Sequence, residues 1–203
     1  MFRSLVFLMV LAISSSFAQV ANEIGRPTFT PGNKFTFTET TYYSGAPIRT
    51  FTLTFKGTVD GTGELIFTEK NEGKPPYDLI YSPDANFVRG SRSKRPEFTP
   101  STLVLSFPMK VGSEWKGEFV QNLSNLPEMT RQRRTSVRSY ETITLPAGTF
   151  DAFKLVSQNW LMNTPGVTRP ADEQYYYCPK VGLVCAYESR QFDRKRQLIA
   201  VER

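Results

Sequence analysis

Strict alternation of apolar and polar residues in several short segments is the feature that most constrains this fold. In Lys34–Thr40 and Phe51–Lys56, aromatic and aliphatic side chains alternate with polar ones, chiefly threonine. This period of two is typical of a β-strand with one buried face. Further strands are predicted at residues 64–70, 77–81, 86–88, 103–107, 113–120 and 197–201. No amphipathic helix longer than two turns is predicted.

Glycine and proline turns separate these segments, so we predict an all-β fold with mostly antiparallel neighbours. A single-domain antiparallel meander, curved into an open barrel, would bury the alternating faces, and a two-layer β-sandwich is the alternative. The predicted organisation is a signal peptide at 1–18, an irregular N-terminal lead-in at 19–33 and a single β-rich domain at 34–203.

A first hairpin is predicted around the turn Pro146-Ala147-Gly148-Thr149, between two segments rich in β-branched and aromatic residues. Proline fixes φ at the start of this turn, and glycine supplies a positive φ later. A four-residue loop places Leu145 opposite Phe150 and Glu141 opposite Lys154, which pairs apolar with apolar and acid with base.

A second hairpin is predicted around Val181-Gly182, which places Cys178 opposite Cys185. The same register gives three further pairs: Tyr176 with Tyr187, Tyr175 with Glu188, and Glu173 with Arg190. The spacing of the cysteines is not that of a Cys-x-x-Cys redox motif. We therefore predict a structural disulfide between Cys178 and Cys185, with two buried free thiols as the alternative.

Three motifs carry a resemblance to a known group of proteins. They are Phe107–Trp115, the Leu-Pro-Ala-Gly-Thr-Phe core of the first hairpin, and the Tyr-Tyr-Tyr-Cys-Pro-Lys-Val-Gly-Leu-Val run of the second. Together they resemble uncharacterised exported bacterial proteins, a domain-of-unknown-function family with the pattern V-P-A-G-T-F-D-A … Y-Y-x-P-x-V-G-L-V. The resemblance covers roughly residues 105 to 190, about half of the chain.

The resemblance implies a periplasmic or envelope-associated β-protein of unknown activity. Many members of that family are lipoproteins, but this chain has no lipidation cysteine near its start. Membrane anchoring is therefore not implied. The family motifs contain no catalytic residue.

The first residues of the chain predict export. Arg3 gives a positive start, residues 5–13 form an apolar run too short to span a bilayer, and Ser16-Phe17-Ala18 fits the small-x-small cleavage rule. We expect cleavage after Ala18 and a periplasmic or extracellular mature chain, with an uncleaved anchor as the alternative. No later apolar run predicts a transmembrane segment. An oxidising compartment also suits the predicted disulfide.

The chain contains no histidine, which excludes Ser-His-Asp and Cys-His mechanisms and histidine-liganded metal centres. No glycine-rich phosphate loop is present, so no cofactor or metal is predicted. Paired carboxylates could still support a carboxylate-dependent glycan hydrolase. The candidate acids for this alternative are Glu64, Glu69, Asp84, Glu97 and Asp151.

Two basic clusters are candidates for an anion-binding surface. The first is a loop and the second a strand, and their members are Arg89, Arg92, Lys94 and Arg95, then Arg131, Arg133, Arg134 and Arg138. On the strand, Arg131 and Arg133 share one face, while Arg134 and Arg138 share the other. Solvated, edge-protecting charge is the alternative interpretation. Nucleic acid is not an expected partner, because export removes it.

Aromatic residues are abundant, at 13% of the chain, and a curved sheet could enclose a cavity lined by them. We therefore predict a non-enzymatic exported protein that binds or carries an envelope component such as a lipid or other amphiphile. The alternatives are the glycan hydrolase and a surface that binds anions or an envelope protein.

Overall fold

The computed structural model describes residues 23–91, 96–122, 127–162 and 170–203. Its strands are β1 (Lys34–Thr40), β2 (Pro47–Thr58), β3 (Leu65–Asn71), β4 (Tyr77–Tyr81), β5 (Phe87–Gly90), β6 (Phe98–Thr99), β7 (Glu114–Gln121), β8 (Met129–Leu145), β9 (Gly148–Leu161), β10 (Ala171–Cys178), β11 (Leu183–Ser189) and β12 (Arg194–Glu202). No helix suited to crossing a membrane occurs in these ranges. The predicted signal peptide and its cleavage site after Ala18 lie outside them and stay predictions.

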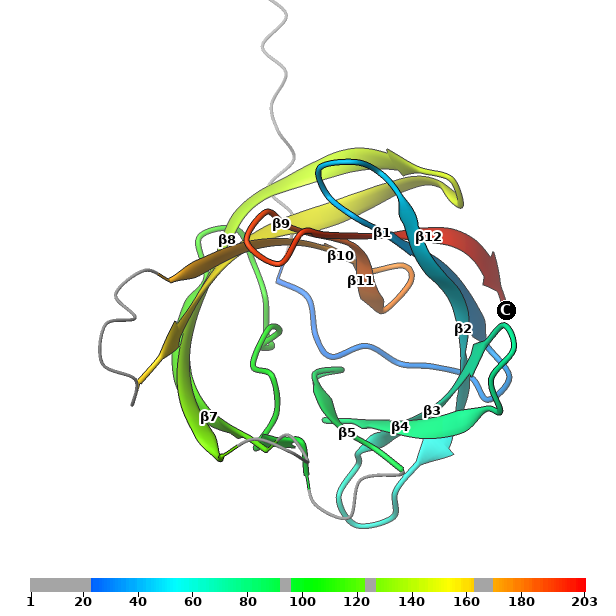
Figure 1. The fold of residues 1–203 in the computed structure, drawn as a ribbon, viewed down its shortest axis with the longest axis horizontal. Coiled ribbons are helices and arrows are strands. Elements are labelled where there is room, and N and C mark those ends of the chain that lie inside the picture. The colour runs from blue at the N-terminus through cyan, green and yellow to red at the C-terminus, as the bar shows by residue number, and fades with distance from the viewer. Residues whose placement is uncertain (1–22, 92–95, 123–126, 163–169) are drawn as a thin grey trace, which may run out of the picture.

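The twelve strands form one antiparallel sheet in the order β5-β4-β3-β2-β1-β12-β11-β10-β9-β8-β7-β6. The sheet is two meanders joined where β1 pairs with β12, from Lys34 opposite Glu202 to Thr40 opposite Lys195. It curves into a nearly closed barrel (Figure 1). The predicted all-β, antiparallel, curved architecture is therefore confirmed, and the sandwich alternative is not what the strands form.

The two edges of the sheet, β5 and β6, approach each other without a strand ladder. The amide of Thr102 donates to the carbonyl of Phe87 at 3.0 Å, and a Glu97 carboxylate oxygen accepts from the amide of Gly90 at 3.0 Å. Nearby, the Asn86 side chain donates to the Leu105 carbonyl at 2.8 Å and accepts from the Leu105 amide at 2.7 Å. Edge groups that would otherwise lack partners are thus satisfied.

Residues 103–107, predicted as a strand, are not one; this prediction is wrong. The segment is irregular, and Leu103 has a positive φ of 53°. Val104 and Leu105 are buried because the segment lies within the ring of strands (Figure 1). The segment is apolar because it fills the barrel interior, and not because it is a strand of the sheet. The Asn86 side chain forms the backbone hydrogen bonds at Leu105 that a neighbouring strand would otherwise form.

The lead-in covers one end of the barrel. Phe29 packs edge-on against Phe67 with ring centroids 5.3 Å apart, and Ile24 forms a two-way backbone bridge with Met109. At Gly182, in the β10–β11 turn, φ is +84° and a Cβ atom would lie 2.9 Å from Phe29. The glycine is therefore required both by the turn and by the packing of the lead-in against it.

The first hairpin forms, but its predicted register is wrong by two residues. Leu145 pairs with Gly148 around a two-residue loop, so Phe150 lies opposite Ile143. A β-bulge between Val137 and Ser139 then shifts the pairing. On the turn side of this bulge, the two-residue loop places Glu141 opposite Ala152, so the predicted Glu141–Lys154 pair does not form. The hairpin is tighter than the four-residue loop anticipated from its proline and glycine.

The second hairpin also forms with a different register, and the predicted disulfide is not present. Cys178 pairs with Leu183, and a bulge between Tyr176 and Tyr177 skips Cys185. Both cysteines are buried free thiols, so the alternative holds. Burial, together with hydrogen bonding to Cys178, raises the pKa of the Cys185 thiol, which disfavours the reactive thiolate.

The other predicted pairs of this hairpin do not form either. Tyr187 lies opposite Tyr175, and Glu188 lies opposite Gln174. Glu173 makes its ion pair with Arg133 on β8 and not with Arg190. The tighter turn is the physical reason, because it shifts the pairing by two residues from the predicted register, and the bulge restores only one of them.

Replacement of Asn86 by alanine tests the closure between β5 and β6. The change leaves the buried Leu105 amide and carbonyl without their partners, so we expect the free energy of unfolding to fall by about 3 kcal/mol. Urea denaturation monitored by circular dichroism measures it. Asn122→Ala, which removes an exposed side-chain hydrogen bond to Pro96, is the control and should change little. Equal, small effects of both changes would contradict this role for Asn86.

Candidate functional site

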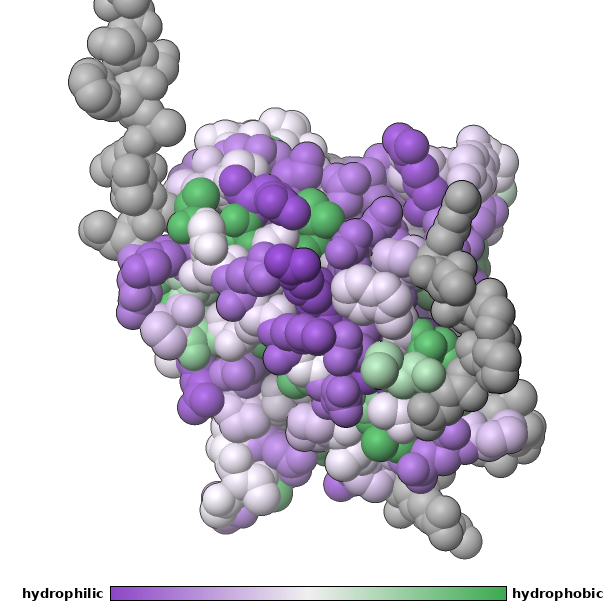
Figure 2. All heavy atoms as spheres, turned by 90° about the vertical axis from the view of Figure 1, so that its left-hand side faces the viewer, coloured by the Kyte–Doolittle hydropathy of each residue, from purple (hydrophilic) through white to green (hydrophobic). Residues whose placement is uncertain are grey.

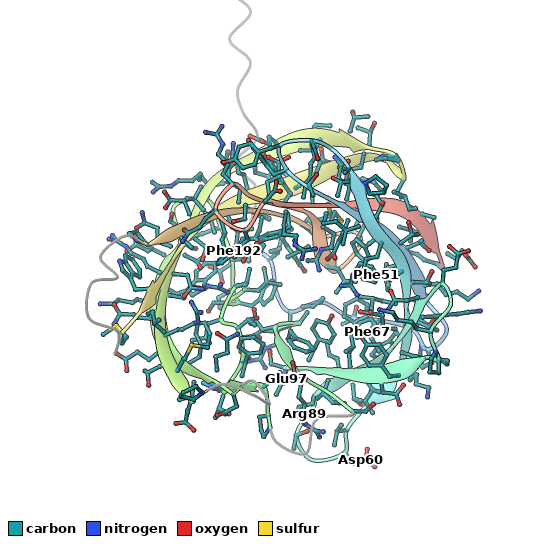
Figure 3. The ribbon with its side chains drawn as sticks, viewed as in Figure 1. Phe51, Asp60, Phe67, Arg89, Glu97 and Phe192 are labelled. Atoms are coloured by element: carbon teal, nitrogen blue, oxygen red, sulfur yellow. The ribbon has the colours of Figure 1, made fainter. Side chains whose placement is uncertain are left out.

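The barrel interior holds a cavity of about 540 Å³. Aromatic and aliphatic side chains form much of its wall, among them Phe37, Phe51, Leu53, Val104, Leu105 and Val184. Phe37 and Phe51 stack with ring centroids 5.5 Å apart. Figure 3 shows Phe51 and Phe67 inside the ring of strands, whereas Asp60 lies at its outer edge. The wall is apolar because the inner face of each alternating strand is apolar.

Edge-on aromatic contacts continue this wall across the gap between β5 and β6. Tyr81 meets Phe87 at 5.6 Å, Phe87 meets Phe98 at 5.7 Å, and Phe98 meets Phe119 at 5.9 Å between ring centroids. Burial raises the pKa of Tyr81 to about 12. Its hydroxyl therefore remains protonated at neutral pH, and this side of the cavity carries no charge from tyrosine.

Charged side chains gather at the other end of the cavity from the lead-in. On each strand they continue the inward-facing series of residues at a spacing of two. Glu39 and Glu69 come after the apolar residues of their strands, which are Phe35 and Phe37, and Leu65 and Phe67. The others come before the inward-facing residues of theirs: Arg49 before Phe51 and Leu53, Arg131 and Arg133 before Thr135 and Val137, Glu173 before Tyr175 and Tyr177, and Arg196 before Leu198. We call these seven residues, Glu39, Arg49, Glu69, Arg131, Arg133, Glu173 and Arg196, the charged ring.

One part of the charged ring is centred on Glu69, which is buried. A single carboxylate oxygen of Glu69 accepts from Arg49 at 2.8 Å, from Asn71 at 2.7 Å and from the Tyr77 hydroxyl at 2.8 Å. Arg49 also donates to Glu39 at 2.7 Å and lies over the Phe51 ring, 4.3 Å from its centroid. The Arg49 guanidinium is therefore bound to two carboxylates.

A second part is the buried pair Arg133–Glu173, with nitrogen and oxygen 2.7 Å apart. Arg133 also donates to the Thr102 carbonyl at 2.6 Å, and Glu173 accepts from the Tyr187 hydroxyl at 3.1 Å. Both side chains are 6% exposed, a depth at which an unpaired charge would be costly. This pair ties β8 to β10 and to the segment that fills the barrel.

The remaining two arginines of the ring, Arg131 and Arg196, have no carboxylate partner among the residues that the structure describes. Arg131 donates to the neutral Gln121 side chain at 2.6 Å. Burial, then the neighbouring charge of Arg133, lowers the pKa of Arg131. The Arg196 side chain makes no hydrogen bond within the described part of the chain, and its buried Nε has no partner there. Its guanidinium lies over the rings of Phe37 and Tyr187, at 5.4 and 6.0 Å from their centroids.

A family model described as DUF3108-like matches residues 119–202. That description, a domain of unknown function, agrees with the coarser part of the resemblance seen in the motifs. None of the curated proteins compared matches the chain.

Two solved structures have similar folds, each at 13% identity. One is from Bacteroides fragilis, described as a candidate exported protein with a YmcC-like fold; the match covers 89% of this chain and all of that one, with a TM-score of 0.42. The other is described as a candidate lipoprotein from Parabacteroides distasonis; the match covers 87% of this chain and 97% of that one, with a TM-score of 0.44.

The structure separates the arginines that were predicted to form an anion surface. Arg131 and Arg133 point into the barrel, whereas Arg134 and Arg138 are exposed on the outside, as the alternation along the strand predicted. Arg134 pairs there with Glu114 at 2.8 Å. The outer face over β7 and β8 is mostly hydrophilic (Figure 2).

The loop cluster contributes less to the cavity. Arg89 lies on β5 opposite Ile80 and does not line the cavity. Arg92, Lys94 and Arg95 lie outside the described residues. A single anion surface made by both clusters therefore stays a prediction, with only Arg131 and Arg133 placed at the cavity.

The candidate carboxylates for hydrolysis are dispersed. Glu69 is in the charged ring, but Glu97 bonds the backbone near the sheet edges and Asp151 bonds Thr142 on the outside. Asp84 pairs with Arg26, and Glu64 is bonded by Thr62 in a turn. No two of these five candidates face each other in the cavity. Among the described residues no cluster of acids or cysteines is arranged for a metal ion.

The prediction from sequence missed most of the charged ring, including Arg49, Glu173 and Arg196. The signal was present: each of these charges occupies a position that the alternation assigns to the inner face. A charged residue that continues an apolar face predicts a buried polar feature, because charges are seldom buried without a partner.

Replacing Glu173 by glutamine tests the buried pair. The change leaves the Arg133 charge uncompensated, so we expect the free energy of unfolding to fall by about 3 kcal/mol. Glu114→Gln is the matched control, because Glu114 pairs with Arg134 on the outer face of the same strand and exposed pairs contribute little. Urea denaturation of both variants provides the comparison. A loss for Glu114→Gln as large as that for Glu173→Gln would contradict the assignment.

Proposed function

We propose that this chain binds an amphiphile inside its barrel, with the apolar part of the ligand in the cavity and its polar part at the charged ring. The observation that carries the proposal is the cavity itself. Its walls are largely apolar and aromatic, and its charged side chains lie at one end. A ligand with the same division of polarity fits such a site.

The size of the cavity supports a small ligand. Its volume of about 540 Å³ lies within the range of roughly 300–1,000 Å³ that is usual for small-molecule sites. The lead-in covers one end through Phe29, and Val104 and Leu105 narrow the interior from the side. An apolar chain that enters from the charged end would therefore end within the barrel.

The proposal includes export. The pattern of residues 1–18 predicts a signal peptide, and a ligand-binding barrel outside the cytoplasm would meet lipids and other amphiphiles of the cell envelope. Binding alone is proposed, with no chemical step. The carboxylate-dependent hydrolase is not favoured, because the two buried carboxylates Glu69 and Glu173 are each occupied by arginine and tyrosine donors.

A series of straight-chain ligands tests the proposal. Each buried methylene contributes about 0.8 kcal/mol, so the dissociation constant should fall roughly fourfold per added carbon until the cavity is filled. Isothermal calorimetry with fatty acids of 6 to about 14 carbons measures this dependence. Affinity that does not change with chain length, or no binding at any length, would contradict the proposal.

Filling the cavity with a larger side chain is the corresponding structural test. Val184 is half-buried and lines the cavity, so Val184→Trp should abolish the binding of long chains. Val156→Trp is the matched control, because Val156 lies on β9 beside the inward-facing Leu155 and points away from the cavity. If Val184→Trp does not fold, Thr102→Trp narrows the facing wall. Unchanged binding in a folded variant of either kind would place the ligand elsewhere.

A further inference from the structure

We propose that the amphiphile carries an anionic oxyacid head group, a carboxylate or a phosphate, and that Arg196 binds it. This inference rests on the proposed function, because it assigns the polar end of the same ligand. It starts from one asymmetry in the charged ring. The side chains of Arg49 and Arg133 are paired with carboxylates, whereas the Arg196 side chain makes no ion pair or hydrogen bond in the described part of the chain.

The position of Arg196 suits a head group. Arg196 lines the interior cavity and also a second hollow at the same end, which is formed by Glu39, Ile48, Arg49, Tyr187, Arg194 and Lys195 together with Arg196 itself. Its guanidinium therefore lies where the interior meets the mouth of the barrel. A ligand whose chain fills the interior would carry its polar end past this point.

The hydrogen-bonding state of Arg196 indicates an acceptor from outside the chain. A guanidinium has five N–H donors in a planar fork that matches carboxylate and phosphate oxygens. Arg49 donates to Glu39 and Glu69, and Arg133 donates to Thr102 and Glu173, although the buried Nε of Arg133 also has no partner among the described residues. The two ends of the Arg133 guanidinium are thus bound, whereas those of Arg196 have no partner in the described part of the chain. A buried donor without an acceptor is costly, and at Arg196 the buried Nε is such a donor.

The nearest acid by register cannot fill this role. Glu39 lies directly opposite Arg196 in the β1–β12 ladder, but its carboxylate is bound by Arg49 at 2.7 Å. Lys195, the other neighbour on β12, is paired with Glu188 at 3.3 Å. Of the four cations around the mouth, Arg49 and Lys195 are paired with acids, which leaves Arg194 and Arg196 without a carboxylate partner among the described residues. The local excess of positive charge favours an anion.

Aromatic rings hold the guanidinium in place. Phe37 and Tyr187 lie within about 6 Å of its central carbon, a distance at which cation–π attraction operates. These contacts cover the guanidinium with apolar surface and exclude water, which strengthens a charge-assisted hydrogen bond to a ligand. Phe37 also stacks on Phe51, so the apolar chain of the ligand would begin at the ring that packs on Arg196.

The direct test compares head groups on one chain length. Binding of dodecanoate, dodecyl phosphate and dodecanol is measured by calorimetry at pH 8, where both acids are ionised. We expect Arg196→Gln to weaken the binding of dodecanoate and dodecyl phosphate by ten- to a hundredfold, the usual effect of losing a charged hydrogen bond. Dodecanol should change by less than about threefold. Arg138→Gln, an exposed arginine on the outer face of β8, is the control and should change none of the three.

The outcomes separate the two proposals. If dodecanol binds the wild-type chain as tightly as dodecanoate does, or if Arg196→Gln affects all three ligands equally, the head-group assignment is wrong and the apolar cavity stands. If none of the three binds, the proposed function itself fails. Arg196→Lys keeps the positive charge but lacks the planar fork of the guanidinium. Its affinity for dodecanoate and dodecyl phosphate should lie between those of wild type and Arg196→Gln, which distinguishes bidentate hydrogen bonding from simple charge attraction.

Two further arms identify the source of the anion. If the head group alone were the ligand, inorganic phosphate or acetate would bind as tightly as the matching twelve-carbon compound, and that result would overturn an amphiphile at this site. We expect both free anions to bind at least a hundredfold more weakly. A preference between dodecanoate and dodecyl phosphate then assigns a fatty acid or a phosphate-bearing lipid as the class.

Discussion

The cost of placing charge inside an apolar barrel is the constraint on which this structure depends. Seven charged side chains point inward at one end of the sheet, and a buried charge without a partner is more costly than almost any other single defect. Glu69 and Glu173 are accordingly surrounded by donors, and each carboxylate joins strands that are distant in sequence. The same interactions that stabilise the barrel also divide its interior into an apolar part and a polar part.

This division has a simple origin in the sequence. The inner face of β2 reads Arg49, Phe51, Leu53 and Phe55, so one strand carries both the charged mouth and the apolar interior. Neighbouring strands repeat the arrangement, and antiparallel pairing brings their charged ends to the same level of the barrel. The architecture therefore creates an amphiphilic site without any loop insertion or cofactor.

The class of fold was readable from the sequence because alternation with a period of two reports directly on buried faces. The registers were not readable, because they depend on the length of each turn and on β-bulges, which leave no clear signal in composition. The turn after Cys178 is tighter than expected and pairs Cys178 with Leu183, and the bulge near Tyr176 leaves Cys185 unpaired, so the expected disulfide does not form. Residues 103–107 were likewise misassigned, because burial makes a segment apolar whether or not it is a strand. These residues are buried, but they fill space inside the barrel. The basic run on β8 was assigned to its two faces correctly. Arg196 was missed because its environment is formed by residues distant in sequence, Phe37 and Glu39 on β1 and Tyr187 on β11.

The central claim is that the barrel is occupied by an anionic amphiphile when the protein is at work. The most direct measurement is the native mass spectrum of the protein, expressed from the full sequence including the predicted signal peptide and purified from the exported fraction without detergent. The account predicts a one-to-one adduct of lipid size that is lost on denaturation and is then detected as a negative ion. A bare protein mass, both as purified and after incubation with excess fatty acid, would contradict it.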